Sequence, residues 1–216
     1  MSGNDSNRIF YNTVPLEVFQ SLTQQGGFDE CIDLELIEKH IAASASIMEV
    51  GAGYGRCVDF LLKKKQEAKI LAIEQSPQLS KVLLDKYKNQ PKVQVLHEDI
   101  KTLVLSDKMD IVLWLFSGML DFGKEEQPVV LKRLRSFLKD DGKLFIDIPQ
   151  LAELTVAKYT SAQDIVMETP YGNITTFLPA WRDIENYASQ AGFSKVSVIH
   201  YNTSTEKKRS IFTLEA

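Results

Sequence analysis

The sequence has little of what marks several large classes of protein. It contains only two cysteines, Cys31 and Cys57, and seven prolines in 216 residues. Two cysteines are too few for a disulfide framework, and the composition is neither collagen-like nor that of a disordered chain. The 25 basic residues are outnumbered by 29 acidic ones, which gives a net charge of −4 and no basic footprint for nucleic acid. We therefore expect a reducing, cytoplasmic setting and no nucleic-acid partner.

Long apolar runs are also missing. The longest mainly apolar stretch, residues 111–120, is about half of the roughly 20 residues that a membrane helix needs. The first residues, MSGNDSNRIF, have neither the charged start nor the apolar core of a secretory signal. We therefore expect a buried strand rather than a membrane span, no membrane partner, and a disordered tail over about the first seven residues.

What the sequence does contain is an alternation of short β-rich runs with helical patterns. Residues 1–45 form a predicted helical cap with two amphipathic helices, one from Pro15 to Gly26 and one beginning at Asp29 as N-cap. Five buried strands follow, at 47–51, 70–74, 93–97, 110–116 and 143–149. Ser76 with Pro77 opens the helix after the second strand, and the helix before the fifth strand is expected to end near Gly142. Such alternation predicts a mostly parallel sheet covered on both faces.

The last third of the chain changes this rhythm. Residues 164–178 read as two strands around a turn at 170–173, and Pro179 opens a helix that stops at Gly192. Two alternating runs, 196–201 and 210–214, predict a closing hairpin. The expected fold is therefore α/β: a doubly wound, seven-stranded, mostly parallel sheet with an antiparallel last strand. Its domain spans 46–216 and includes a strand-rich insertion after the fifth strand, at about 150–178, as a substrate lid.

A glycine-rich turn follows the first strand. Gly51, Gly53 and Gly55 alternate with other residues just before a helix, so the backbone can turn tightly and present N–H groups to a ligand. The dinucleotide fingerprint would place a third small residue where Arg56 stands, and no Gly-Lys-Ser/Thr follows, which excludes a P-loop. Glu49, just before the turn, favours a ligand with a cationic amino group over one with a pyrophosphate.

Two further acids stand at the ends of the next strands. Glu74 lies 25 residues after Glu49, and Asp99 lies 25 residues after Glu74. Parallel strands end at one edge of the sheet, where open α/β folds bind their ligands. One carboxylate can accept the two hydroxyls of a ribose, and another can accept an adenine amino proton. The alternative is a turn without a ligand and two solvated strand-end acids.

Five ordered motifs, EVGAGYG, ILAIEQS, HEDI, MDIVLWLFSGMLDF and LRSFLKDDGKLFIDIP, give the sequence a resemblance to a known family. From about residue 40 to 216 it resembles the Rossmann-like class I methyltransferases that use S-adenosyl-L-methionine. The resemblance implies that cofactor, with Glu49 near its amino group, Glu74 on the ribose and Asp99 on the adenine. The full implied cofactor-binding set is Glu49, Gly51, Ala52, Gly53, Gly55, Glu74, Gln75, Asp99, Ile100 and Leu115, the last near the sulfonium.

A sulfonium donor already carries a reactive methyl group, so the protein must position the acceptor in line and exclude water. Positioning of this kind can supply ~7–11 kcal/mol of the barrier. The candidate catalytic residues, as bases or amine-orienting groups, are Tyr11, Asp121 and Asp147. Each also has a structural alternative: an acid after a strand can cap a turn, and Tyr11 can pack on the core. The three histidines are scattered, so no metal site is expected.

The predicted function is methyl transfer from S-adenosylmethionine to a small-molecule acceptor, an amine being one candidate, by in-line displacement. The strand-rich insertion favours a small acceptor, and the chain reads LFSGMLDF where methyltransferases of exocyclic base or amide nitrogens carry Asn/Asp-Pro-Pro-Tyr. The alternatives are a protein or peptide acceptor, or a non-catalytic protein that binds the cofactor. A nicotinamide oxidoreductase is disfavoured by Arg56. The sequence leaves the oligomeric state open.

Overall fold

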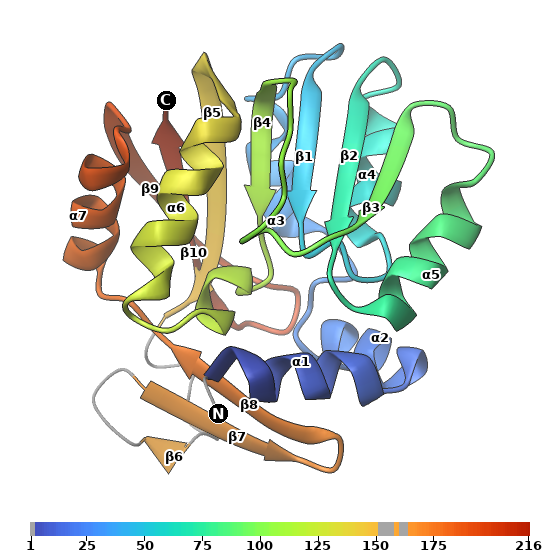
Figure 1. Cartoon of the computed structure of the whole chain (residues 1–216), viewed down its shortest axis with the longest axis vertical. Helices are drawn as coiled ribbons and strands as arrows, with labels where there is room; N and C mark the ends of the chain where they lie inside the picture. The colour runs from blue at the N-terminus through green and yellow to red at the C-terminus, as the bar shows by residue number, and fades with distance from the viewer. Residues whose placement is uncertain (1–2, 151–157, 160–163) are drawn as a thin grey trace.

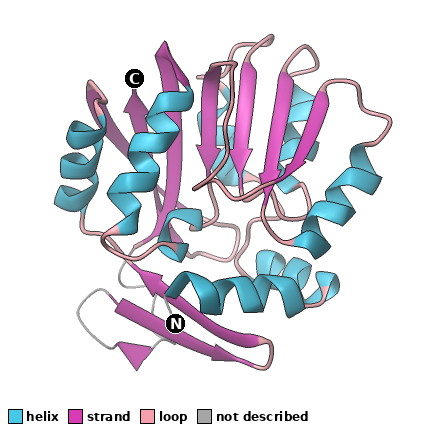
Figure 2. Ribbon diagram, viewed as in Figure 1, coloured by secondary structure: helices cyan, strands magenta, loops and turns pink. Residues whose placement is uncertain are grey.

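The computed structural model describes residues 3–150, 158–159 and 164–216. Its centre is a seven-stranded sheet in the order β3-β2-β1-β4-β5-β10-β9, in which β10 runs antiparallel to both of its neighbours (Figures 1 and 2). The predicted fold class is confirmed, including the antiparallel last strand. The strands are β1 (Ser46–Val50), β2 (Lys69–Glu74), β3 (Val93–His97), β4 (Met109–Trp114), β5 (Leu138–Pro149), β9 (Lys195–Asn202) and β10 (Lys208–Glu215).

Helices cover both faces of the sheet. Because neighbouring residues of a strand point to opposite faces, Ile47 and Met48 of β1 belong to two different cores. The core around Ile47 includes α3 (Ile32–Glu38), α4 (Arg56–Lys64) and α5 (Pro77–Tyr87). The core around Met48 includes α6 (Glu126–Phe137) and α7 (Trp181–Ala191). Burial on both sides explains why the strands read as continuous apolar runs.

Two helix ends differ from the sequence prediction. The helix expected to begin at Asp29 begins at Ile32, after Cys31 takes a left-handed conformation with φ of 56°. The helix expected to end near Gly142 ends at Phe137, because Leu138 already begins β5 and pairs with Met109 of β4. Gly142 lies inside β5 and not at a helix end.

Two N-terminal helices, α1 (Gly3–Thr13) and α2 (Leu16–Gln25), lie across the edge where the parallel strands end (Figure 1). Phe10, Val14 and Phe19 form a small core there with Leu79 of α5. The expected disordered tail is wrong for residues 3–7, which belong to α1. Ser6 and Asn7, two of the polar residues that suggested a tail, have hydrogen-bond partners that are distant in sequence, so the sequence pattern alone could not reveal them.

The insertion after β5 forms a second, three-stranded sheet of β6 (Lys158–Tyr159), β7 (Asp164–Thr169) and β8 (Gly172–Phe177). β7 and β8 pair antiparallel around the predicted turn, and β8 packs against α1 (Figure 1). Residues 151–157 and 160–163 of the expected lid lie outside the described residues. Within the part that is described, no helix has the length and apolar character to cross a bilayer.

Candidate active site

The glycine turn joins β1 to α4 at the covered edge of the sheet. The N–H groups of Gly51 and Ala52 donate to the Ile73 carbonyl, at 2.9 and 3.0 Å, and tie the turn to β2. Gly51, Gly53 and Gly55 all have positive φ, which favours glycine. A methyl group on Gly51 would meet nothing within 4 Å, whereas one on Gly55 would collide with the Tyr87 hydroxyl. Gly51 therefore borders open space, and Gly55 allows helix packing.

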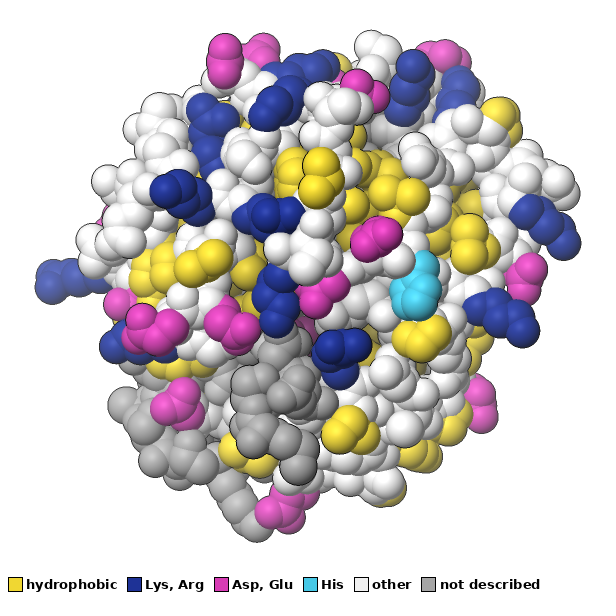
Figure 3. Space-filling view, in the orientation of Figure 1, with side chains coloured by type: hydrophobic (Ala, Val, Ile, Leu, Met, Phe, Trp, Pro, Cys, Tyr) yellow, Lys and Arg dark blue, Asp and Glu magenta, His cyan; other side chains and the backbone are white. Residues whose placement is uncertain are grey.

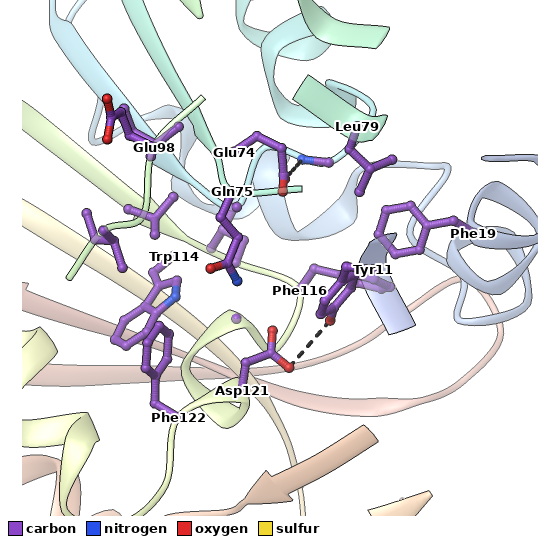
Figure 4. Close-up of a pocket in the computed structure, with 17 residues that line it drawn as sticks. Tyr11, Phe19, Glu74, Gln75, Leu79, Glu98, Trp114, Phe116, Asp121 and Phe122 are labelled. Atoms are coloured by element: carbon purple, nitrogen blue, oxygen red, sulfur yellow. Dashed lines mark hydrogen bonds between the residues drawn. The ribbon is translucent and has the colours of Figure 1, made fainter. Parts of the chain in front are cut away.

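A cleft of about 690 Å³ opens beside this turn. Its walls come from α1, α2, the ends of β1, β2 and β4, and the loops that follow β3 and β4 (Figure 4). It is lined by Tyr11, Phe19, Val50, Gly51, Gly53, Ile73, Glu74, Gln75, Leu79, Glu98, Ile100, Trp114, Leu115, Phe116, Gly118, Asp121 and Phe122. Segments from residue 11 to residue 122 thus meet in one cavity.

A second cavity of about 350 Å³ adjoins the first and shares Gly51, Gly53 and Leu115 with it. Glu49 lines this second cavity and is only 5% exposed. Burial raises the pKa of the Glu49 carboxyl to about 7, although a hydrogen bond with the Cys57 thiol lowers it in part. No hydrogen bond from the described residues reaches its Oε2. A buried carboxylate oxygen without a partner is costly, and a cationic group in this cavity would satisfy it.

Glu74 is held firmly at the edge of the cleft. Its Oε2 accepts from the Gly53 N–H (Figure 4) and its Oε1 from the Ser76 N–H, both at 2.8 Å. Burial raises the pKa of Glu74 above its ordinary value, and these backbone donors offset part of that rise. The lone pairs that remain on both oxygens make the carboxylate a fixed acceptor for hydroxyl groups. Gln75, the next residue, also lines the cleft.

The far end of the cleft differs in one residue from the expected set. Ile100 lines it, but Asp99 does not: the Asp99 Oδ1 accepts from the Lys101 N–H at 2.8 Å and caps a turn. Glu98 lines the cleft instead. The acid doublet in HEDI was the available signal for Glu98, and the sequence alone could not decide which of the two acids faces inward.

Tyr11 and Asp121, two of the three candidate catalytic residues, are brought together. The Tyr11 hydroxyl lies 3.4 Å from the Asp121 Oδ1 (Figure 4). Asn7, which the sequence analysis missed, donates from Nδ2 to the same oxygen at 3.0 Å and to the Thr175 carbonyl of β8 at 2.8 Å. Burial raises the pKa of Asp121 to about 7, and that of Tyr11 well above its ordinary value. Tyr11 therefore stays protonated at neutral pH.

Asp147, the third candidate, lies outside both cavities. It is fully buried and paired with Arg209, and it accepts from the Tyr201 hydroxyl at 2.9 Å. Its carbonyl accepts from the Ser117 N–H at 3.0 Å, and Arg209 donates to the Ser117 hydroxyl at 2.8 Å. The expectation that Asp147 contacts the acceptor is therefore wrong. Asp147 instead supports the turn that carries Phe116, a residue of the cleft wall.

Comparisons with known proteins agree with this fold. Residues 47–142 match the model of a methyltransferase domain family, and no curated protein matches the chain. Among solved structures, the glycopeptide N-methyltransferase MtfA is 13% identical, with 86% of this chain and 89% of that one covered and a TM-score of 0.68. The 1,6-didemethyltoxoflavin-N1-methyltransferase of Burkholderia thailandensis is 14% identical, with coverage of 93% and 86% and a TM-score of 0.65.

A third solved structure, CalS10, an amino pentose methyltransferase from Micromonospora echinaspora, is 13% identical, with coverage of 91% and 96% and a TM-score of 0.63. At such low identities, these similarities show a shared fold. The methyltransferase domain matched over residues 47–142 and the shared fold are consistent with a class I S-adenosylmethionine-dependent methyltransferase.

Proposed function

We propose that the protein transfers the methyl group of S-adenosylmethionine to a small-molecule acceptor bound in the cleft. The observation that carries the proposal is the pair of buried carboxylates, Glu49 and Glu74, each of which lines one of the two cavities that Gly51 borders. One has an oxygen for which the described residues offer no partner, and the other is oriented by two backbone donors. A ligand with an ammonium group at one end and vicinal hydroxyls further along would satisfy both.

The cofactor's other parts fit the remaining residues. Glu49 would hold the ammonium group, and Gly51, Ala52 and Gly53 would lie against the methionine portion. Glu74 and Gln75 would meet the ribose, and Leu115 the sulfur. Ile100 would pack on the adenine, with Glu98 accepting its amino proton. Gly55 would act indirectly, by letting α4 begin close to the turn.

The bound cofactor supplies an electrophilic methyl group, and the chain's own residues position the acceptor and exclude water. Tyr11 of α1 and Phe19 of α2 close one side of the cleft, and Trp114 and Phe122 line another. Asn7 joins α1 to both Asp121 and β8. The cleft covered by α1, α2 and β8 suits a compact acceptor. A folded protein acceptor could enter only if α1 and β8 moved apart.

Two measurements test the proposal. Calorimetry with S-adenosylhomocysteine tests the cofactor site, and we expect clear binding by the wild-type protein. Labelled S-adenosylmethionine is then incubated separately with a metabolite extract and with denatured lysate. We expect label in the small-molecule fraction. Label only in protein or peptide would establish the alternative acceptor class, and binding without transfer to any fraction would indicate a non-catalytic protein.

A further inference from the structure

We infer that the acceptor is a small amine whose N–H groups are received by Asp121, in a subsite formed with Tyr11 and Asn7. This inference rests on the proposed methyl transfer and specifies its substrate. It depends on the charge of the cleft, on the orientation of the Asp121 carboxylate, and on the aromatic wall beside it.

The charge of the cleft is one-sided. The described residues that line it include three carboxylates, Glu74, Glu98 and Asp121, but no lysine or arginine. On the face seen in Figure 3, basic and acidic side chains are interspersed, so the acidity belongs to the cleft and not to that surface. A carboxylate or phosphate on the acceptor would meet like charge with no lysine or arginine of the cleft lining to offset it. A cationic or hydrogen-donating acceptor is favoured instead.

Asp121 is the acid left for the acceptor. Glu74 and Glu98 lie beside the proposed ribose and adenine positions, whereas Asp121 lies in the short helix η1 (Gly118–Asp121), across the cleft. Figure 4 shows the Asp121 and Gln75 side chains facing the same space. Asp121 therefore contributes a charge that the cofactor does not need.

Among the described residues, the Asp121 carboxylate accepts side-chain hydrogen bonds through only one of its two oxygens. Its Oδ1 accepts from Asn7 and lies 3.4 Å from the Tyr11 hydroxyl. Within the described part of the chain, no hydrogen bond to Oδ2 is found. Asn7 is itself fixed, because its Oδ1 accepts from the Thr175 N–H at 2.7 Å. Since an ionised carboxylate is purely an acceptor, its free oxygen selects a ligand that donates.

The wall next to Asp121 is aromatic. Trp114 and Phe122 meet edge to face with ring centroids 5.5 Å apart, and Phe116 lies further along the cleft. Aromatic faces attract cations and also accommodate the hydrocarbon part of an organic amine. A compact amine with an apolar body therefore satisfies both sides of the subsite.

An acceptor that enters as an ammonium ion first gives one proton to the Asp121 carboxylate, which exposes the nitrogen lone pair. That lone pair forms the new nitrogen–carbon bond while the carbon–sulfur bond breaks and its electrons stay on sulfur. The products are a methylated ammonium ion and neutral S-adenosylhomocysteine, and Asp121 releases its proton to solvent.

The test measures ligand binding by NMR to the protein saturated with S-adenosylhomocysteine. The probes are a panel of aryl and alkyl amines, each with its matched alcohol and carboxylate, such as benzylamine, benzyl alcohol and benzoate. We expect the best amine to bind at least tenfold more tightly than both of its matched probes. Asp121→Asn should remove this preference and keep S-adenosylhomocysteine affinity within twofold. Asp140→Asn, the same change at an exposed site, should preserve the preference.

The opposite results would overturn the inference: no amine binding, an alcohol or carboxylate binding as tightly as its amine, or a preference that survives Asp121→Asn. If Asp121→Asn does not fold, the wild-type ranking decides alone. Absence of S-adenosylhomocysteine binding by the wild-type protein would instead refute the proposed function. Failure of the amine inference and failure of the proposed function are therefore distinguishable.

Discussion

Arg209 and Asp147 form a buried ion pair between the neighbouring strands β10 and β5. Through Ser117, this pair reaches the turn after β4, where Phe116 and Ser117 both adopt positive φ, 53° and 66°. Consecutive left-handed residues other than glycine cost roughly 1–3 kcal/mol each and persist only where their surroundings fix them. The ion pair thus helps to set the wall of the cleft.

Replacing Asp147 should therefore be severe. Asp147→Ala leaves a buried guanidinium without its partner, and we expect the free energy of unfolding to fall by about 3–5 kcal/mol, measured by urea denaturation. Tyr201→Phe is the matched control, because it removes one hydrogen bond to Asp147 and keeps the ion pair; its expected cost is about 1 kcal/mol. Equal costs for the two variants would contradict this account of Asp147.

Two glycines of the turn should respond differently to alanine. Gly55→Ala forces a methyl group against the Tyr87 hydroxyl, so we expect lost stability, by about 2 kcal/mol or more. Gly51→Ala meets no steric clash and should cost only about 1–2 kcal/mol, from its left-handed φ of 71°. Its methyl group would border both cavities, so we expect at least tenfold weaker binding of S-adenosylhomocysteine by calorimetry. Wild-type affinity in Gly51→Ala would contradict the proposed position of the cofactor.

The fold was predictable because its signals are local. Alternating strand and helix patterns fixed the order of elements, and the crossover rule then brought Gly51 and Glu74 to one edge. The error at Gly142 shows the limit of local signals. A glycine shortly after a helical pattern resembles a helix end, yet pairing with β4 decided where β5 begins.

The candidate site was predictable only in part, because much of it depends on distant contacts. Tyr11 and Asp121 were each named, but 110 positions separate them and their pairing follows from the packing of α1. Asn7 was missed because its partners, Asp121 and Thr175, are distant from it in the sequence. Asp147 resembled Asp121 as an acid at a strand end, and only the register with β10 reveals its pairing with Arg209.

The buried acids should give the protein without ligand an unusual pH dependence. The pKa of Glu49 is raised from 4.5 to about 7 and that of Asp121 from 3.8 to about 7. The folded state therefore binds protons more tightly than the unfolded state, and these two groups lower stability as pH rises from about 4 to 7. Glu49→Gln should remove part of this fall, on the order of 1–3 kcal/mol between pH 5 and 8 by urea denaturation. An unchanged slope would contradict the raised pKa of Glu49.

The central claim is that the Glu49 carboxylate binds the ammonium group of the cofactor, and calorimetric titration with S-adenosylhomocysteine at several pH values tests it most directly. Since only ionised Glu49 attracts the ammonium group, wild-type affinity should fall up to roughly tenfold per pH unit below about 7 and level off above it. Asp121→Asn should keep this profile, whereas Glu49→Gln should bind at least tenfold more weakly at pH 8 and lose the dependence. A Glu49→Gln protein with wild-type affinity and an unaltered pH profile would contradict the account.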